Sequence, residues 1–246
     1  MIDQQQAKEA YEVFLQKAKD DDRIVGIILA GGRGKGVATS NSDYDVILVT
    51  TDEGFEGVKR DYPETEYIDS LPHAISTFRE YAKTGTRTQY DKYTFTYNIA
   101  LVDKTGEIQK LIDEKGTLDP ETAEKIAHDA LGGYLNSLYR SLKNFRDGNI
   151  LAGQLDASET IPRILTFVFA IENRVRPFNK SLVWELEKYP LTKLPIRSTD
   201  LVAKIQSIAQ SCDVETQKEF LQTMRKMANE NGHADEIVGW EGHYFG

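Results

Sequence analysis

Hydrophobic residues in the first fifty positions change their spacing from one segment to the next. Over residues 4–19 they recur three and four positions apart, which predicts an amphipathic helix. Residues 24–30 form a short apolar run rich in β-branched side chains, and residues 44–50 form a second, so both predict buried strands. A loop rich in Gly and Ser, residues 31–42, joins them. The predicted order is helix, strand, loop, strand.

The pattern between positions 51 and 113 is weaker. It predicts a strand near residues 66–68 and a helix near residues 75–82. Residues 93–102 alternate between apolar and polar so regularly that they predict a long strand with one apolar face. The residues expected on that face are Tyr93, Phe95, Tyr97, Ile99 and Leu101. A turn at residues 103–106 follows and leads into a further segment, residues 107–113.

Helical spacing dominates after Gly116. Residues 117–122 have the composition of a helix start. Helices are predicted over residues 121–147, 155–173, 181–188, 199–210 and 214–229. The fold class expected is therefore α+β, with an α/β domain over residues 1–117 and an all-helical domain over residues 118–246.

Composition restricts the classes of partner. The chain has 246 residues, of which 40% are hydrophobic and 28% charged, with a net charge of −9, so a generic nucleic-acid binder is not expected. Its single cysteine, Cys212, excludes an intrachain disulfide and a cysteine-built zinc site. The longest apolar run, residues 164–171, is too short to cross a membrane, and residues 1–22 are too polar for a secretory leader. We expect a cytoplasmic protein without a membrane partner, and the oligomeric state is left open.

The strongest chemical pattern is Gly31-Gly32, ten further residues, and then Asp43-Tyr44-Asp45. Two carboxylates at positions i and i+2 of a strand point to the same face, so they can share a hard cation such as Mg²⁺. Glycines after a buried strand let backbone N–H groups approach phosphates. Ions that bridge carboxylates and phosphates favour in-line attack at the α-phosphorus of a nucleoside triphosphate. A plain turn followed by a solvated strand edge is the structural alternative.

These residues resemble a known signature. The helix and apolar strand, followed by Gly31-Gly32 and by Ser42-Asp43-Tyr44-Asp45-Val46, resemble the nucleotidyltransferase superfamily of polymerase-beta-like proteins. Residues 165–171 and 176–181 are similar to a helical stretch of its aminoglycoside adenylyltransferase branch. The resemblance implies a nucleotidyltransferase domain, built as a small mixed sheet with flanking helices, followed by a helical bundle. It also implies Mg²⁺ as cofactor and transfer of a nucleoside monophosphate, AMP from ATP, to a hydroxyl of a small acceptor. A cationic antibiotic of the aminoglycoside type is the candidate acceptor, with antibiotic resistance as the biological role.

The resemblance assigns roles to individual residues. Gly31, Gly32 and Ser42 belong to its nucleotide-binding segment. The family places a third carboxylate, as general base or metal ligand, on a later strand, and the matching catalytic position here is Asn98. An amide cannot take a proton from an attacking hydroxyl. Asp69, Asp91 or a carboxylate of the helical domain would have to supply that function.

Three residues of the helical half also receive roles. Lys180 matches a family lysine that reaches the triphosphate, and Lys143 is assigned a similar role. Glu159, predicted at a helix start, stands where the branch has an acidic group facing a cationic substrate, and Asp156 and Glu172 would add to the attraction. The structural alternatives are solvated lysines and charges that complement helix ends.

Two other functions compete. A degenerate, nucleotide-binding regulatory or antitoxin-like member without transferase activity is favoured by Asn98. The segment 28–34 also resembles the opening of sugar-nucleotide pyrophosphorylases, but Gly36 stands where those proteins have arginine. A phosphate-binding loop of the P-loop type is excluded because no Gly-Lys-Ser/Thr follows at the required spacing.

Overall fold

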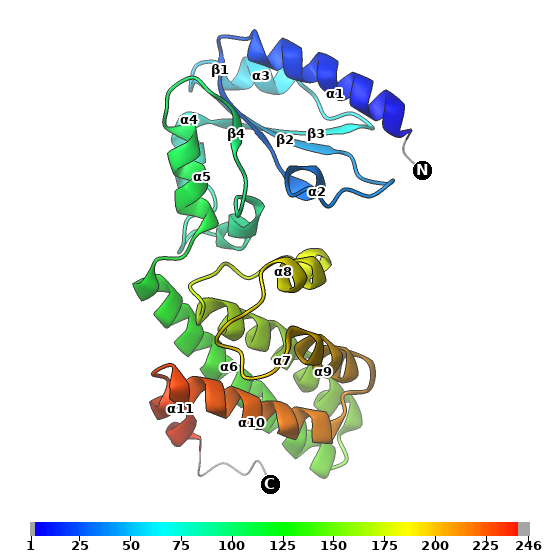
Figure 1. Ribbon diagram of the computed structural model, residues 1–246, viewed down its shortest axis with the longest axis vertical. Coiled ribbons are helices and arrows are strands. Elements are labelled where there is room, and N and C mark those ends of the chain that lie inside the picture. The colour runs from blue at the N-terminus through cyan, green and yellow to red at the C-terminus, as the bar shows by residue number, and fades with distance from the viewer. Residues whose placement is uncertain (1–2, 241–246) are drawn as a thin grey trace. The chain divides into compact units, whose positions relative to one another are not determined.

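The computed structural model describes residues 3–240 and combines a small mixed sheet with many helices, so the α+β prediction is confirmed (Figure 1). The chain forms two compact units, Met1–Thr117 and Leu118–Gly246. The elements of the first unit are α1 (Gln4–Lys19), β1 (Ile24–Leu29), α2 (Gly31–Gly34), β2 (Tyr44–Thr50), α3 (Phe55–Asp61), β3 (Ile68–Ala74), α4 (Ile75–Glu80), the 3-10 helix η1 (Gln89–Thr94), β4 (Ala100–Asp103) and α5 (Ile108–Gly116).

The four strands lie in the order β3-β2-β1-β4. Strand β1 runs antiparallel to both β2 and β4, whereas β2 and β3 are parallel. A parallel pair needs a crossover connection, and the segment containing α3 provides it. The register of this pair places Asp45 directly beside Asp69. Residues paired in this way project from the same face of a sheet.

Each face of the sheet carries its own apolar core. On one face, Ile27, Val46 and Leu48 pack with residues of α1. On the other, Ile47 and Val49 pack with residues of α4 and α5. Because side chains alternate along β2, Asp45 shares the second face with this pair. The carboxylate of Asp45 therefore lies just beyond the apolar core of that face.

The prediction of one long strand over residues 93–102 is wrong. The 3-10 helix η1 and a turn occupy most of this segment, and β4 begins only at Ala100. Tyr97 adopts a left-handed conformation with φ of +67°, which an extended strand does not contain. Tyr93 and Phe95 are buried, whereas the later alternating residues are exposed. The alternation therefore does not mark one apolar face.

Two further boundaries differ from prediction. Strand β3 spans Ile68–Ala74, whereas the sequence predicted a strand only near residues 66–68. Its polar residues and Pro72 hide the strand pattern, and proline is tolerated because β3 is an edge strand. The predicted loop 31–42 begins with the short helix α2.

The second unit consists of helices. They are α6 (Pro120–Arg146), α7 (Ile150–Ala170), the 3-10 helix η2 (Asn179–Ser181), α8 (Leu182–Lys188), α9 (Ser198–Ser211), α10 (Val214–Glu230) and α11 (Ala234–Gly239). Helix α7 begins five residues before its predicted start at position 155, and Gly153 explains the error. Glycine is a poor helix former, but here a Cβ would lie 2.9 Å from the Phe145 ring, so the approach of α6 and α7 requires it. No helix within residues 3–240 combines the length and apolar character needed to cross a membrane.

Buried Lys115 gives a testable pH dependence of stability. Its side chain is fully buried and its Nζ donates to the Arg79 carbonyl oxygen at 3.2 Å, while burial lowers its pKa to about 8. Below pH 8 the folded state holds a buried charge, so wild-type stability increases as pH rises from 8 towards the ordinary lysine pKa. We expect Lys115→Met to gain about 2 kcal/mol relative to wild type at pH 7 and to lose this advantage by pH 10. Urea unfolding of both proteins measures the difference, and parallel pH profiles would contradict the assignment.

Candidate functional site

The glycine-rich segment turns back directly onto the end of β1. Ala30 N donates to the Asp45 carbonyl oxygen at 2.8 Å, which continues the ladder between β1 and β2. Gly31 then takes a left-handed conformation, φ +57°, and starts α2. A Cβ on Gly34 would lie 2.2 Å from the Leu29 carbonyl oxygen, so α2 packs on the strand more closely than any side chain allows. The segment is thus fixed by backbone contacts.

Arg33 ties the loop to the segment that carries the aspartates. Its Nε donates to the Asp43 carbonyl oxygen at 2.9 Å, and its Nη2 donates to the Ser42 carbonyl oxygen at 2.7 Å. The guanidinium also lies 3.9 Å from the centroid of the Tyr44 ring, a cation–π contact. The Ser42 hydroxyl accepts from Thr39 N at 2.9 Å, which places it in the turn before β2. This role of Arg33 could not be predicted from the sequence, because its backbone acceptors leave no pattern of residue types.

Asp45 and Gly31 are in close contact. A Cβ on Gly31 would lie only 1.7 Å from Asp45 Oδ2, so the carboxylate occupies the space that any other residue would fill. Position 31 also requires a positive φ, which favours glycine on separate grounds. The glycine predicted to approach a nucleotide therefore leaves the space for one of the two predicted metal ligands.

A third carboxylate belongs to the same end of the sheet. Asp69 is the register partner of Asp45 in the parallel pair of β2 and β3. Burial raises the pKa of Asp69, and the negative charges of Glu64 and Asp43 raise it further. Asp43 directly precedes β2 and stands two residues before Asp45. Asp43, Asp45 and Asp69 thus form an acidic group, called here the aspartate site.

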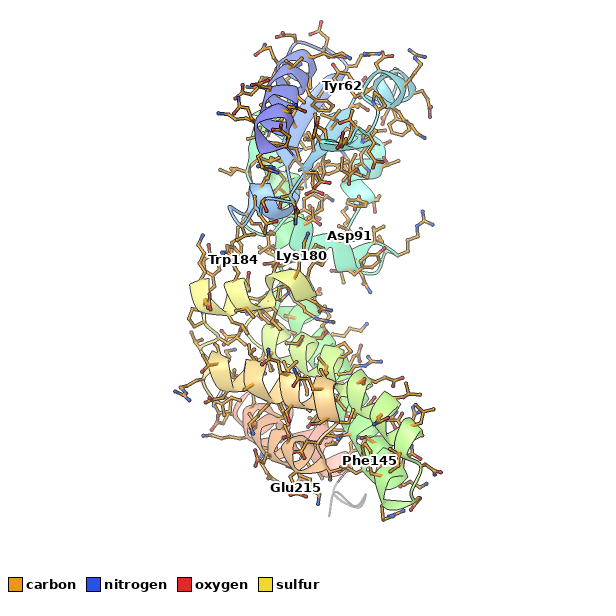
Figure 2. The ribbon with its side chains drawn as sticks, turned by 90° about the vertical axis from the view of Figure 1, so that its right-hand side faces the viewer. Tyr62, Asp91, Phe145, Lys180, Trp184 and Glu215 are labelled. Carbon is orange, nitrogen blue, oxygen red and sulfur yellow. The ribbon has the colours of Figure 1, made fainter. Side chains whose placement is uncertain are left out.

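The other predicted partners of the aspartates have different environments. Asn98 is 6% exposed, its Nδ2 donates to the Thr94 carbonyl oxygen at 2.7 Å, and its Oδ1 lies near Gly34. Asp91 accepts from the Tyr81 hydroxyl at 2.8 Å and lies in η1 (Figure 2). Of the carboxylates considered in place of Asn98, Asp69 is the one that strand register sets beside Asp45.

The remaining predicted site residues belong to the second unit. Lys180 is exposed in η2 (Figure 2), and Lys143 is exposed in the last turn of α6. Glu159 is exposed and lies 3.5 Å from the Ser137 hydroxyl. It stands well inside α7, so the prediction that it lies at a helix start is wrong, because α7 begins at Ile150. The roles of Lys143, Lys180 and Glu159 stay predictions.

Two acidic residues expected to attract a cationic substrate have structural partners instead. Asp156 is 3% exposed and accepts from Arg140 and Asn144, both at 2.8 Å. Glu172 accepts from the backbone N–H of Lys193 and from the hydroxyl of Thr192. Both carboxylates join segments of the helical unit through these hydrogen bonds, and Arg140 also compensates the negative charge of Asp156.

The described part of the chain contains no complete protein cage for a metal ion. Within residues 3–240, no three histidine, cysteine or carboxylate side chains are grouped closely enough to enclose a metal ion. Mg²⁺ is usually bound through one or two carboxylates together with substrate phosphates and water, so a complete protein cage is not needed at a triphosphate site.

Comparison with known proteins finds a distant similarity to solved structures. No protein-family model matches the chain, and no curated protein matches it either. Among solved structures, the chain is similar to a nucleotidyltransferase-like protein from Exiguobacterium sibiricum 255-15, with 11% sequence identity and a TM-score of 0.40, over 97% of this chain and 88% of that chain. At this level of identity we infer the chemistry of the present chain from its own side chains.

Proposed function

We propose that the chain is a Mg²⁺-dependent nucleotidyltransferase that moves a nucleoside monophosphate from a nucleoside triphosphate to a hydroxyl of a small acceptor. The observation that carries this proposal is the contact of the Asp45 carboxylate with Gly31, at a point where strand register adds Asp69. Acidic side chains rarely gather at a backbone turn without a cation to compensate them, because like charges repel. A metal-bound triphosphate supplies that compensation.

The donor set fits magnesium. Asp43 and Asp45 offer carboxylate oxygens, which Mg²⁺ prefers, and both are partly exposed where β2 begins. Gly32 carries no Cβ atom that would keep phosphates away from the backbone, while the missing Cβ of Gly31 leaves the space that the Asp45 carboxylate occupies. When bound, the ion would neutralise charge on the phosphates and on the leaving group. We assign Asp43 and Asp45 as its ligands, with the triphosphate completing the coordination.

Asp69 is the proposed general base. In the transfer, the acceptor oxygen forms a bond to the α-phosphorus, the bond from that phosphorus to its bridging oxygen breaks, and pyrophosphate leaves. The acceptor hydroxyl gives its proton to the Asp69 carboxylate. Its register position beside Asp45 sets Asp69 at the same end of the sheet as the proposed metal ligands, which a base for the acceptor hydroxyl requires. Asn98, buried and bonded to Thr94, would position the turn beside Gly34.

Glu64 provides a test of Asp69 as the base. The base works only when ionised, so activity is lost as pH falls through the pKa of Asp69. Because the charge of Glu64 raises that pKa, Glu64→Gln should shift the acid limb of the pH–rate profile to lower pH, by a few tenths of a unit for an exposed charge. Glu66→Gln is the matched control, since Glu66 is also exposed but is not among the charges acting on Asp69. Equal profiles for wild type and both variants would remove Asp69 from the proposed role.

The acceptor and the base of the nucleotide are the finer parts of the proposal. ATP is the proposed donor, and an aminoglycoside-like polyol with amino groups is the proposed acceptor. Glu159 is the proposed acidic group for the acceptor, and Lys143 and Lys180 are the proposed cations for the triphosphate. Pyrophosphate release, measured with ATP or GTP, Mg²⁺ and a panel of aminoglycosides, tests these assignments directly. Release with one nucleotide and one acceptor class supports transfer.

A nucleotide-binding protein without transferase activity is the second candidate, and the observation that favours it is Asn98. The same assay separates the two. Triphosphate binding without pyrophosphate release, whatever the acceptor, would support the binding protein and contradict the transferase.

A further inference from the structure

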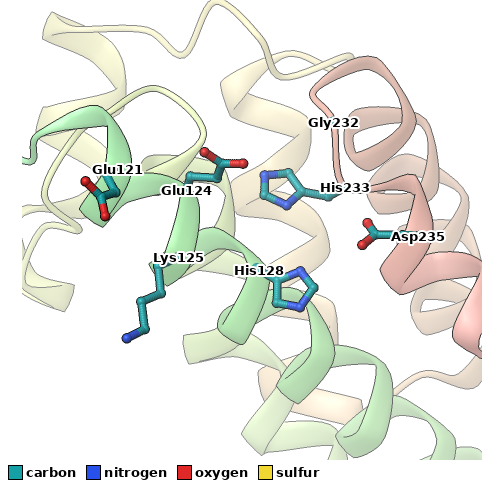
Figure 3. A pocket seen from close by; sticks show the side chains of 7 residues that line it. All are labelled: Glu121, Glu124, Lys125, His128, Gly232, His233 and Asp235. Atoms are coloured by element: carbon teal, nitrogen blue, oxygen red, sulfur yellow. The ribbon is translucent and has the colours of Figure 1, made fainter.

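A pocket of about 320 Å³ lies in the helical unit, between the first turns of α6 and the start of α11 (Figure 3). This volume is near the lower end of the range for small-molecule sites. Its lining residues are Glu121, Glu124, Lys125, His128, Gly232, His233 and Asp235. None of them belongs to the site proposed for the transferase. All of them belong to one compact unit, which forms the pocket by itself.

The backbone at the end of α10 shapes this pocket. Gly232 turns the chain with φ of +85°, and His233 N donates to the Ala228 carbonyl oxygen at 2.9 Å. On the facing helix, Gly132 leaves room for Glu236, whose Oε1 would lie 2.7 Å from a Cβ at that position. Glu236 Oε2 lies 3.3 Å from His128 Nε2 and fixes that imidazole. The two histidines are therefore held at the pocket by separate elements.

His233 has an unused hydrogen-bonding group. The residue is only 5% exposed, and its ring packs 6.0 Å from Phe167 and 6.3 Å from His128, measured between ring centroids. No residue within the described range 3–240 forms a hydrogen bond with its ring nitrogens. Burial, and then the neighbouring His128, lower the pKa of His233, while Glu124 and Asp235 act in the opposite direction. A neutral imidazole keeps one nitrogen as an acceptor, and at the pocket this nitrogen can take a donor from a bound molecule.

The charges around this imidazole are mainly negative. Three carboxylates line the pocket against one ammonium group, that of Lys125. Glu124 and His128 stand four residues apart on α6, so they lie on the same side of that helix. Figure 3 shows the Glu124 carboxylate and the His233 ring directed towards one another, with Asp235 on the other side of His233. A metal ion is not favoured, because no three of these side chains are grouped closely enough to hold one within the described residues.

We propose that this pocket binds a small organic dication of the alkyl diamine class, whose ammonium groups meet Glu124 and Asp235 and donate an N–H to the His233 ring. An ammonium supplies an N–H donor to the ring nitrogen at the pocket and a positive charge to the carboxylates. A flexible chain of three to five carbons suits the small volume. Charge-assisted hydrogen bonds of this kind are stronger than neutral ones.

Titration calorimetry of the whole chain with 1,4-diaminobutane at low ionic strength tests the proposal. We expect saturable binding with one site, and no binding of the neutral analogue 1,4-butanediol at the same concentration. Glu124→Gln should weaken the affinity roughly tenfold, the loss expected for one charge-assisted hydrogen bond. Asp129→Asn is the matched control, because Asp129 is an exposed acid of the same helix that does not line the pocket. Its affinity should stay within about twofold of wild type, the screened effect of one more distant charge.

Three results would overturn the proposal. The first is equal affinity for the diol and the diamine. The second is an equal loss of diamine affinity in Glu124→Gln and Asp129→Asn. The third is binding of zinc ion, in a titration with zinc chloride, by a protein that does not bind the diamine. His233→Gln should also lose affinity, and its far-ultraviolet circular dichroism shows whether it folds. Asp43→Asn, which removes a proposed metal ligand in the other unit, should bind the diamine like wild type, so failure of the transferase proposal is recognised separately.

Discussion

Replacing Asp45 by Asn is expected to reduce the rate of pyrophosphate release at least ~100-fold, with no loss of folded structure. The amide has the shape of the carboxylate but lacks its charge, so it is a poor ligand for Mg²⁺. Loss of charge stabilisation at the transferring phosphoryl group removes several kcal/mol from the transition state, and every 1.4 kcal/mol is about tenfold in rate. Continuous detection of pyrophosphate with ATP and the best acceptor measures the effect.

The control for this variant is Asp22→Asn. Asp22 is an exposed aspartate of the same unit, away from the aspartate site in the sequence, and the substitution changes the net charge equally. It should keep the wild-type rate within about twofold. Equal rates for wild type and Asp45→Asn would show that Asp45 does not take part in the chemistry.

Gly31→Ala is expected to abolish the site through geometry instead of charge. The new Cβ would lie 1.7 Å from Asp45 Oδ2, so the carboxylate has to leave its place or the turn has to rearrange. The left-handed conformation adds about 1–2 kcal/mol of strain for a residue with a side chain. We expect a rate loss comparable to that of Asp45→Asn, together with a lower free energy of unfolding, measured by urea denaturation.

Gly36→Ala separates the two effects. Gly36 also has a positive φ, +71°, but a Cβ there meets nothing within 4 Å. This variant should therefore show the conformational strain, about 1 kcal/mol, and keep most of its activity. If Gly31→Ala and Gly36→Ala lose activity equally, contact with Asp45 is not what position 31 contributes.

Much of the first unit follows from local patterns. Helix α1 begins and ends at the predicted residues because its apolar spacing is regular and the Asp3 carboxylate caps the N–H groups of Gln5 and Gln6. Strand β2 also has its predicted bounds, because an apolar run between polar segments defines it. The spacing of Asp43 and Asp45 is also a local pattern, and it predicts that the two carboxylates share one face.

Features that depend on distant residues were not predictable in this way. Asp69 is one of several carboxylates that the sequence offers in place of Asn98, and only the parallel register of β3 with β2 distinguishes it from the others. The alternation over residues 93–102 suggested a strand, but burial of Tyr93 and Phe95 in the tertiary core overrides it. Gly34 and Arg33 act through backbone atoms of other segments, which leave no signal of their own.

The central claim is that Asp43 and Asp45 hold a metal-bound triphosphate. Titration calorimetry of a non-hydrolysable ATP analogue, with and without Mg²⁺, tests it most directly on the wild type and on the double variant Asp43→Asn/Asp45→Asn. We predict binding to the wild type that is at least ~10-fold tighter with Mg²⁺, and no such difference in the double variant. Mg²⁺-dependent binding that persists unchanged in the double variant would contradict the proposed site.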